Sequence, residues 1–287
     1  MLTQLKIQDF LSRATKGEVT LPLSSINNFG ESCKDALSKQ FVSEPRKFRI
    51  RMSQLGKPIC QQLLEKQIPF LFVTNNSQRS RCDVVLKLSN LGIEVETHHI
   101  FTCAISTARF LAQQNPSGSA YVIGDAGLLN ALHINGYAIN ETNPDYVVVG
   151  EGRLINFEVL EKALKFIMEG AKLIATNLDP NCPIDGGMRP GCGSTIAFLE
   201  TASNRKALNL GKPSPIMMRM ARNELDLRTE EVTMIGDTMD TDILGGLQMG
   251  YRTVLVYSGS TQPQDLGRYP YAPSLAIPAL KDLIAEL

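Results

Sequence analysis

Residues 232–243 read VTMIGDTMDTDI, and this stretch decides the fold class of the chain. Its first four residues are apolar or β-branched, which is typical of a short strand buried in a parallel sheet. Gly236 and Asp237 follow that strand directly, a helix is expected up to Met249, and another strand is expected over residues 253–256. Strands that alternate with helices predict an α/β fold with a parallel sheet, in which ligands bind beyond the carboxyl ends of the strands.

A unit of the same kind lies earlier in the chain. Residues 59–66 have the pattern of a helix, and residues 68–73 form a short apolar run that ends at Thr74. A further helix is expected over residues 215–225, shortly before the stretch quoted above. Because both strands belong to one predicted parallel sheet, we expect Thr74 and Asp237 at the same edge of it.

The middle of the chain repeats the alternation on its own. Strands are expected near residues 120–123, 146–149 and 173–175, and helices over residues 106–114 and 157–169. The sequence therefore predicts a Rossmann-like parallel-sheet core of residues 56–101 and 206–287, with an α/β cap domain inserted as residues 102–205.

Charge and cysteine usage narrow the class of partner. Lysine plus arginine and aspartate plus glutamate each total 29, so the formal net charge is zero. This argues against a nucleic-acid or membrane-surface binder, which needs a basic field, and leaves a small molecule as the expected partner. The six cysteines form no C-x-x-C pair, and no signal peptide or long apolar run is found, so we expect reduced thiols in the cytoplasm.

Two aspartates of the quoted stretch are candidate metal ligands. Asp237 comes directly after a buried strand, where its carboxylate is fixed at the sheet edge, and Mg²⁺ prefers such oxygen ligands while it keeps several waters. Asp242 lies near the first turn of the next helix, where it could accept from backbone N–H groups or reach the metal through water. An acidic residue that merely starts a helix is the other interpretation of Asp242.

Two further segments carry groups that suit a phosphate. Thr74 offers a hydroxyl, and Asn75 and Asn76 offer successive backbone N–H groups at a strand-to-helix turn. Lys212, within the string Gly-Lys-Pro, precedes a helix and could bring an ammonium charge to a phosphorylated intermediate. Each segment alone is an ordinary turn or a solvated lysine, but their order around a domain-sized insertion indicates phosphoryl transfer.

With these motifs in this order, residues 56–287 resemble the haloacid dehalogenase superfamily of phosphatases. The resemblance is to the branch with a large α/β cap, which includes p-nitrophenyl and sugar-phosphate phosphatases. It implies that Thr74 binds phosphate, that Lys212 steadies the nucleophile and the intermediate, and that Asp237 binds Mg²⁺. It also implies a small phosphorylated metabolite as substrate and a homodimer formed through the cap.

Two cap passages are typical of the same branch. They read ATNLDP over residues 175–180 and GGMRPG over residues 186–191. In the family, cap loops close over the substrate and exclude water. The resemblance therefore implies Asp179 and Arg189 as substrate contacts, besides Asn75 and Asn76.

One element of the family pattern is missing. The family places its nucleophile in an Asp-x-Asp-Gly string at the end of an apolar strand, here near position 40, where residues 39–44 read KQFVSE. The aspartates before Thr74, Asp9 and Asp35, are not followed by a second one two positions later. Residues 48–52 alternate apolar and basic side chains, which suits a half-exposed strand and not a buried central one.

The first residues also differ in composition from the rest. Residues 1–57 hold 10 Lys/Arg against 5 Asp/Glu, so residues 1–55 are expected to be an atypical N-terminal segment, with poor order as one interpretation. A reading-frame error and a genuinely divergent form both explain such a segment, and the sharp compositional change favours the error.

Two functions follow from this pattern. The first is a Mg²⁺-dependent phosphomonoester hydrolase that acts on a sugar phosphate or a compound like p-nitrophenyl phosphate. The alternative is a catalytically inactive phosphate-ligand-binding or regulatory protein, because no other residue is an evident replacement for the attacking carboxylate. An oxidoreductase that binds a dinucleotide is less favoured, since no strand is followed by Gly-x-Gly-x-x-Gly.

Overall fold

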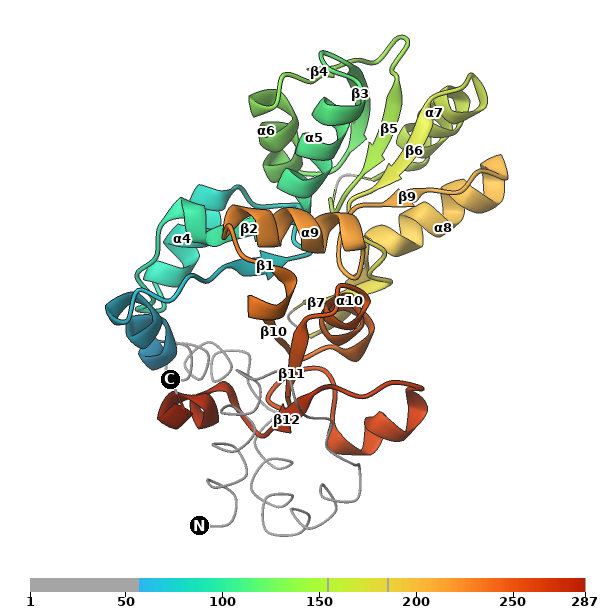
Figure 1. Cartoon of the computed structure of the whole chain (residues 1–287). Coiled ribbons are helices and arrows are strands. Elements are labelled where there is room, and N and C mark those ends of the chain that lie inside the picture. The colour runs from blue at the N-terminus through green and yellow to red at the C-terminus, as the bar shows by residue number, and fades with distance from the viewer. Residues whose placement is uncertain (1–56, 154, 185, 287) are drawn as a thin grey trace.

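The computed structural model describes residues 57–153, 155–184 and 186–286 (Figure 1). The predictions for residues 1–55, including Asp9, Asp35 and the alternating residues 48–52, lie outside the described residues. The described chain forms two α/β parts, drawn one above the other in Figure 1, with helix α9 (Pro215–Glu224) between them.

The upper part is the inserted cap, built on a parallel sheet in the order β4-β3-β5-β6-β9. Its strands are β3 (Ser119–Ile123), β4 (Ala138–Ile139), β5 (Tyr146–Val149), β6 (Lys172–Ala175) and β9 (Leu208–Asn209). The strands expected near residues 120–123, 146–149 and 173–175 are therefore confirmed. Because β9 pairs with β6, the cap sheet extends to Asn209, beyond residue 205, where the sequence placed the end of the insertion.

Helices cover both faces of the cap sheet. They are α5 (Cys103–Gln114), α6 (Ala126–Ile134), α7 (Phe157–Met168) and α8 (Cys192–Ser203). All four residues of β5 are buried, and their side chains alternate between the two faces. Val148 packs with the cluster that contains α5 and α6, whereas Val147 and Val149 pack with α7 and α8. Burial on both faces explains the uninterrupted apolar run of this strand.

The core sheet is parallel but lies in two pieces within the described residues. Strand β1 (Phe72–Thr74) pairs with β2 (Ile100–Thr102), and β10 (Thr233–Gly236) pairs with β11 (Arg252–Val256), which pairs with β12 (Leu275–Ile277). In the described part of the chain no strand pairs with the second edge of β1 or of β10.

Both pieces nevertheless share one hydrophobic cluster. Ile100 of the first piece and Val254 and Ile277 of the second pack in this cluster, together with Ile59 from the helix of residues 57–65. Strand β10 is not fully covered by its neighbours, since Ile235 in this strand keeps 40% of its surface exposed. Within the described residues the core strands therefore lie in two parallel pieces, and β1 and β10 are not neighbours there.

The remaining elements connect these layers. They are α4 (Arg81–Ser89), α10 (Leu244–Gln248), the short helices η2 (Thr97–His99), η3 (Thr229–Glu231), η4 (Met239–Ile243), η5 (Pro263–Arg268) and η6 (Leu280–Glu286), and an antiparallel hairpin of β7 (Asn181–Ile184) and β8 (Gly187–Pro190). The helix expected up to Met249 is divided, because a π-type turn, η4, precedes α10.

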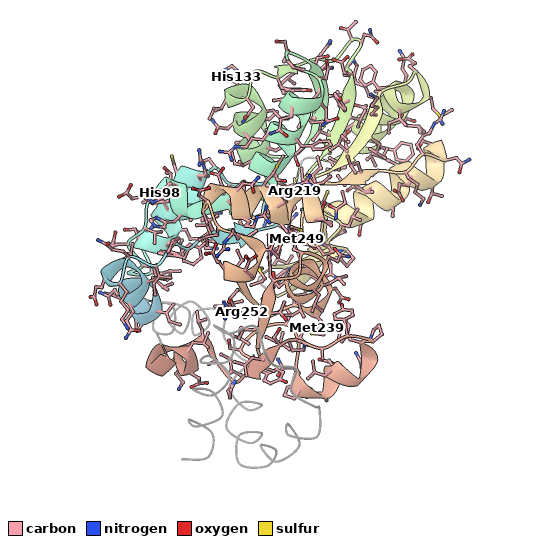
Figure 2. All side chains as sticks on the ribbon, in the orientation of Figure 1. His98, His133, Arg219, Met239, Met249 and Arg252 are labelled. Atoms are coloured by element: carbon pink, nitrogen blue, oxygen red, sulfur yellow. The ribbon has the colours of Figure 1, made fainter. Side chains whose placement is uncertain are left out.

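The histidines do not gather into one site. His133 lies on α6 of the cap, and His98 lies in the core beside α4, well apart from it (Figure 2). Among the described residues no three His, Cys, Asp or Glu side chains form a group that could hold a metal ion. In the same part of the chain, no helix has the length and apolar character needed to cross a membrane.

Candidate functional site

The first segment of the site is the turn that leaves β1. Thr74 is the last residue of the strand, and its Oγ1 accepts a hydrogen bond from the backbone N–H of Asn76 at 3.1 Å. The side-chain oxygen of Asn76 accepts in turn from the backbone N–H of Arg79 at 3.1 Å. These local bonds shape the turn and leave the chain at the carboxyl end of a parallel strand, where ligands bind in such sheets.

Lys212 reaches the same edge from the loop before α9. Its Nζ lies 2.6 Å from Oδ1 of Asp242, and both side chains are largely buried, with 12% and 5% of their surfaces exposed. The preceding Gly211 is needed for this approach, because a Cβ there would overlap the carbonyl oxygen of Thr176. A buried ammonium and carboxylate at this distance form a charge-assisted hydrogen bond.

Asp237 and Asp242 lie together beyond the end of β10. Oδ2 of Asp242 accepts from the backbone N–H groups of Asp237 and Thr238, each at 3.2 Å, so this carboxylate organises the turn as well as pairing with Lys212. Oδ2 of Asp237 accepts from the backbone N–H of Ser260 at 2.7 Å. The predicted acceptance of N–H groups by Asp242 is therefore present, at a π-type turn rather than at an ordinary helix start.

A Mg²⁺ ion is compatible with this donor set in part. Such an ion usually takes one or two carboxylates, substrate phosphate oxygens and several waters. Asp237 suits it, because no hydrogen bond from the described residues reaches its Oδ1. Asp242 is less available, since one oxygen faces Lys212 and the other faces two N–H groups. The residues present thus fit a cation held chiefly by Asp237.

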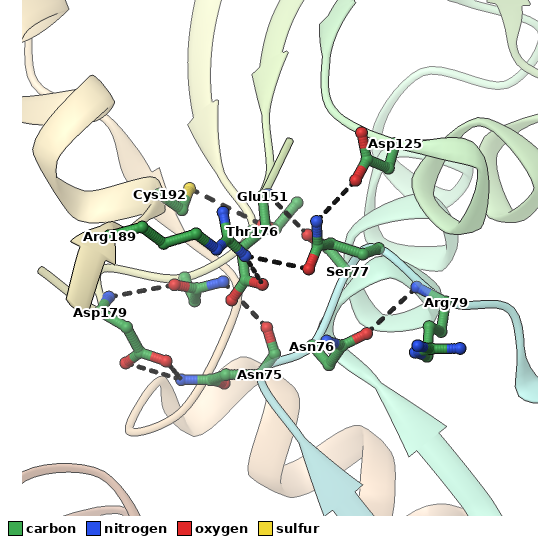
Figure 3. A network of polar contacts seen from close by, with 12 residues as sticks. Asn75, Asn76, Ser77, Arg79, Asp125, Glu151, Thr176, Asp179, Arg189 and Cys192 are labelled. Carbon is green, nitrogen blue, oxygen red and sulfur yellow. Dashed lines mark hydrogen bonds and ion pairs between the residues drawn. The ribbon is translucent and has the colours of Figure 1, made fainter. Parts of the chain in front are cut away.

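The cap contributes Asp179 and Arg189 to the junction between cap and core, beside the turn that leaves β1 (Figure 3). Each carboxylate oxygen of Asp179 accepts from Nδ2 of Asn75 at 3.2 Å. Burial raises the pKa of Asp179, against the opposing effects of the Asn75 hydrogen bond and the Lys212 charge. Nη2 of Arg189 donates to Oε1 of Gln78 at 2.9 Å and lies 3.3 Å from Oε2 of Glu151.

Glu151 is the buried acid on the cap side of the site. Burial raises the pKa of its carboxyl, and the Arg189 guanidinium partly offsets that rise. Its backbone N–H donates to Oγ of Ser77 at 2.8 Å, so the cap strand β5 leads straight to the turn after β1. Gln78 completes the link, because its Nε2 donates to Asp125 at the start of α6 at 2.6 Å.

Hydrogen bonds connect several of the predicted site residues. One connected group holds Asn75, Asp179, Lys212, Asp242 and the backbone of Asp237. Thr74 and Asn76 belong to the turn beside it, while Arg189 binds its own partners on the cap side. The side chains of Asn75, Asp179, Arg189 and Asp242 are thus engaged with protein groups.

Sequence reasoning missed four members of this junction: Ser77, Gln78, Glu151 and Asn177. Ser77 and Gln78 continue the string that begins at Thr74, and Asn177 lies two residues past β6, so a reading of every strand end would have found them. Glu151 also follows a strand, but only the docking of the cap explains its pairing with Arg189.

A parallel α/β core with an inserted α/β cap, and with hydroxyl, ammonium and carboxylate groups where the two meet, is the arrangement that the resemblance in the sequence implied. The family comparison agrees, because the model described as haloacid dehalogenase-like hydrolase matches residues 56–138 and the HAD-hydrolase-like model matches residues 209–283. The chain belongs to the haloacid dehalogenase-like hydrolases, as the resemblance in its sequence indicated.

The curated relatives include named phosphatases. The chain is 39% identical over 223 residues to the dihydroxyacetone phosphatase of Corynebacterium glutamicum. The match covers 78% of this chain and 81% of the relative. The chain is 36% identical over 221 residues to the ribonucleotide monophosphatase NagD of Escherichia coli, with 77% and 87% covered.

Solved structures give the same fold. A double mutant of the thermostable NPPase from Geobacillus stearothermophilus has a TM-score of 0.75 and 37% identity, covering 78% of this chain and 89% of that one. The p-nitrophenyl phosphatase from Archaeoglobus fulgidus has a TM-score of 0.75 and 35% identity, with 79% and 89% covered. The predicted Rossmann-like core with an α/β cap is therefore confirmed.

Proposed function

We propose that this chain is a Mg²⁺-dependent phosphomonoester hydrolase that acts on a small phosphorylated metabolite. The observation that carries the proposal is the position of Thr74, Lys212 and Asp237 at the carboxyl ends of two parallel core strands and the loop beside them. The names of the related proteins, a dihydroxyacetone phosphatase, a ribonucleotide monophosphatase and a p-nitrophenyl phosphatase among them, support a sugar phosphate, a nucleotide or p-nitrophenyl phosphate as the kind of substrate.

Each residue has a proposed role in binding the phosphate. Thr74 and the backbone of Asn75 and Asn76 donate to phosphate oxygens, and Lys212 supplies a positive charge. The N–H of Asn76, which donates to Thr74 Oγ1 in the structure, exchanges that partner for the phosphate. Asp237, with Asp242 behind it, holds the Mg²⁺ ion, which when bound neutralises negative charge on the transferring group.

The cap side of the site is proposed to contact the rest of the substrate. Asp179 lies on the loop after β6 and Arg189 lies on β8, and both bond to residues of the turn that follows β1, Asn75 and Gln78. We also propose a cytoplasmic location and a homodimer formed through the cap. Ile134 and Ile139, exposed beside the open edge of β4, are the apolar residues offered to a second copy.

A second candidate function is supported by a specific observation. The sequence before Thr74 contains no Asp-x-Asp pair, and the ammonium of Lys212 already has a carboxylate partner in Asp242. A protein with these groups but without an attacking carboxylate binds a phosphorylated ligand and does not turn it over. Such a chain acts as a phosphate-ligand-binding or regulatory protein.

One pair of measurements separates the two. Hydrolysis of p-nitrophenyl phosphate is assayed with Mg²⁺ and with EDTA, and binding of inorganic phosphate is measured by calorimetry in Mg²⁺. The hydrolase predicts turnover that EDTA and Asp237→Asn abolish. The matched control is Asp240→Asn, three residues further on in η4, an exposed carboxylate that accepts a hydrogen bond from the hydroxyl of Tyr269. Saturable binding without turnover selects the binding protein, and neither binding nor turnover in a folded protein contradicts both.

A further inference from the structure

Both polar ends of the Asn75 side chain form hydrogen bonds within the protein. Only 8% of the residue is exposed. Its Oδ1 accepts from the backbone N–H of Lys212 at 2.7 Å, and its Nδ2 donates to the backbone carbonyl of Lys212 at 3.2 Å. Nδ2 also donates to both carboxylate oxygens of Asp179. An amide has two N–H donors and one acceptor oxygen, so these partners occupy both ends of the group.

Asn75 is also held from behind through its backbone. Its carbonyl oxygen accepts from Nδ2 of Asn177 and from Sγ of Cys103, each at 2.9 Å. On the Lys212 side, a Cβ on Gly211 would lie 2.9 Å from Oδ1 of Asn75, closer than real Cβ atoms approach. The residue therefore has little freedom to turn its amide toward a ligand.

These contacts form a row that crosses from cap to core. It runs from Asp179 on the cap loop, through the Asn75 amide, to the backbone of Lys212, and through the Lys212 ammonium to Asp242. The two bonds from one amide to one residue's N–H and C=O resemble the pairing between neighbouring strands. They fix the backbone from which the lysine side chain extends.

We infer that Asn75 is a positioning residue, which fixes the backbone of Lys212 and couples it to Asp179 of the cap, and that its side chain is not a substrate ligand. The role in phosphate binding rests on the proposed function, but the positioning of Lys212 does not. The backbone N–H of Asn75, which the sequence offered to a phosphate, keeps that proposed role.

The substitution Asn75→Asp tests the inference at one atom. The variant keeps the oxygen that accepts from the Lys212 N–H, but it replaces Nδ2 by an oxygen that faces the Lys212 carbonyl and the Asp179 carboxylate. We expect the backbone of Lys212 to loosen and its ammonium to leave Asp242. The double variant Asn75→Asp with Asp179→Asn restores a donor and an acceptor between the two side chains, but not the donor to Lys212.

The accessibility of the Lys212 amine is measured as its rate of modification by a small acylating reagent. Mass spectrometry gives this rate at several pH values. We expect modification in Asn75→Asp to be roughly tenfold faster than in the parent, the effect of one unpaired buried group on an equilibrium. The double variant should stay fast, whereas Asp179→Asn alone should stay slow, because it keeps both bonds to Lys212. Asn140→Asp is the matched control, since Asn140 also braces a loop by bonds to Thr142 and Asn143, away from this site.

The phosphate measurement then separates this inference from the proposed function. If the parent binds inorganic phosphate, Asn75→Asp should weaken binding roughly tenfold while Asn140→Asp leaves it unchanged. If the parent binds none, the proposed function fails while the lysine modification still tests the positioning role. Equal modification rates in the parent and in a folded Asn75→Asp variant would overturn the inference. If Asn75→Asp does not fold, Asp179→Asn provides the test. Fast modification of Lys212 in that variant would overturn the inference, because the position of Lys212 would then depend on the cap carboxylate and not on Asn75.

Discussion

Glu151 illustrates how one residue joins the cap to the core. It follows the buried strand β5, its backbone bonds to Ser77 in the turn after β1, and its carboxylate pairs with Arg189 from β8. A buried carboxylate is tolerated because it is paired and hydrogen-bonded. Burial still raises the pKa of Glu151, so the cationic partner does not fully offset the loss of water.

This raised pKa predicts how stability changes with pH. The folded state holds the Glu151 proton at pH values where the unfolded chain, with an ordinary value of 4.5, has released it. The stabilisation is complete below the unfolded pKa and is lost as pH rises through the folded pKa, so Glu151 lowers the free energy of unfolding as pH increases in that window. The raised pKa of Asp179 acts in the same direction.

The measurement is urea unfolding of the parent and of Glu151→Gln between about pH 4.5 and pH 7. The variant should lose part of the decline with pH. The groups that face Glu151 are Arg189, Cys182 and Asp179, and all remain in the variant. Glu158→Gln, which removes an exposed carboxylate from α7, is the matched control. Parallel curves for the parent and Glu151→Gln would contradict the assignment.

At this scale the sequence located part of the site. Thr74 and Asp237 could be predicted because each stands at the end of an apolar strand, and Lys212 because it precedes a helix in a short Gly-Lys-Pro string. The partners of these residues could not be predicted. The pairing of Arg189 with Glu151 and of Asn75 with Asp179 depends on how the cap docks on the core, which no local pattern encodes.

Among the elements, the loop before α9 has little room for change. Gly211 lies where the loop passes the carbonyl of Thr176 and the side chains of Asn177 and Asn75. A glycine is required there by the close approach of backbone to backbone and not by its dihedral angles. The loop can bring Lys212 to the sheet edge only while this contact is kept.

Gly211→Ala should therefore lower the free energy of unfolding by about 1–3 kcal/mol, the usual cost of forcing an extra methyl into a packed site. It should also weaken phosphate binding, because Lys212 moves with the loop. Urea unfolding and calorimetry measure the two effects. Gly187→Ala is the matched control, since a Cβ there meets no atom within 4 Å. A variant as stable as the control would show that the loop shifts freely.

The alternation of elements was predictable, and the reason is visible in the cap. The expected strand of residues 146–149 has the bounds of β5, because burial on both faces demands a continuous apolar run. The hairpin of β7 and β8 was missed, since most of its residues are exposed and its strands show no apolar period. Helix α6 was missed as well, although Asp125 stands at its start.

For the whole molecule, the difference between the two sheets matters most. The cap sheet has five strands and buried inner strands, whereas the core strands β1 and β10 are each paired on one side within the described residues. Sequence patterns identified β1, β10 and its neighbour β11, but not β2 or the order of the strands. Strand order depends on which segment lies between two strands, and a pattern within each strand carries no such information.

Hydrogen exchange should therefore divide the molecule into a slow cap and a faster core. Amides of β5 have partners on both sides in β3 and β6 and lie under helices on both faces, so they should exchange only by large-scale unfolding. Amides of β10 lie at an edge beside the 40% exposed Ile235 and should exchange by local opening. Mass-spectrometric exchange on peptides that cover β5 and β10 measures both.

Equal protection of β5 and β10 would mean that β10 has a second partner in the folded chain. Faster exchange of β10 would mean that the strand carrying Asp237 is held mainly by β11 and by the contacts of the site itself. In that case, addition of Mg²⁺ and phosphate should slow the exchange of β10 and leave β5 unchanged, because a ligand stabilises most strongly the segment whose opening would release it.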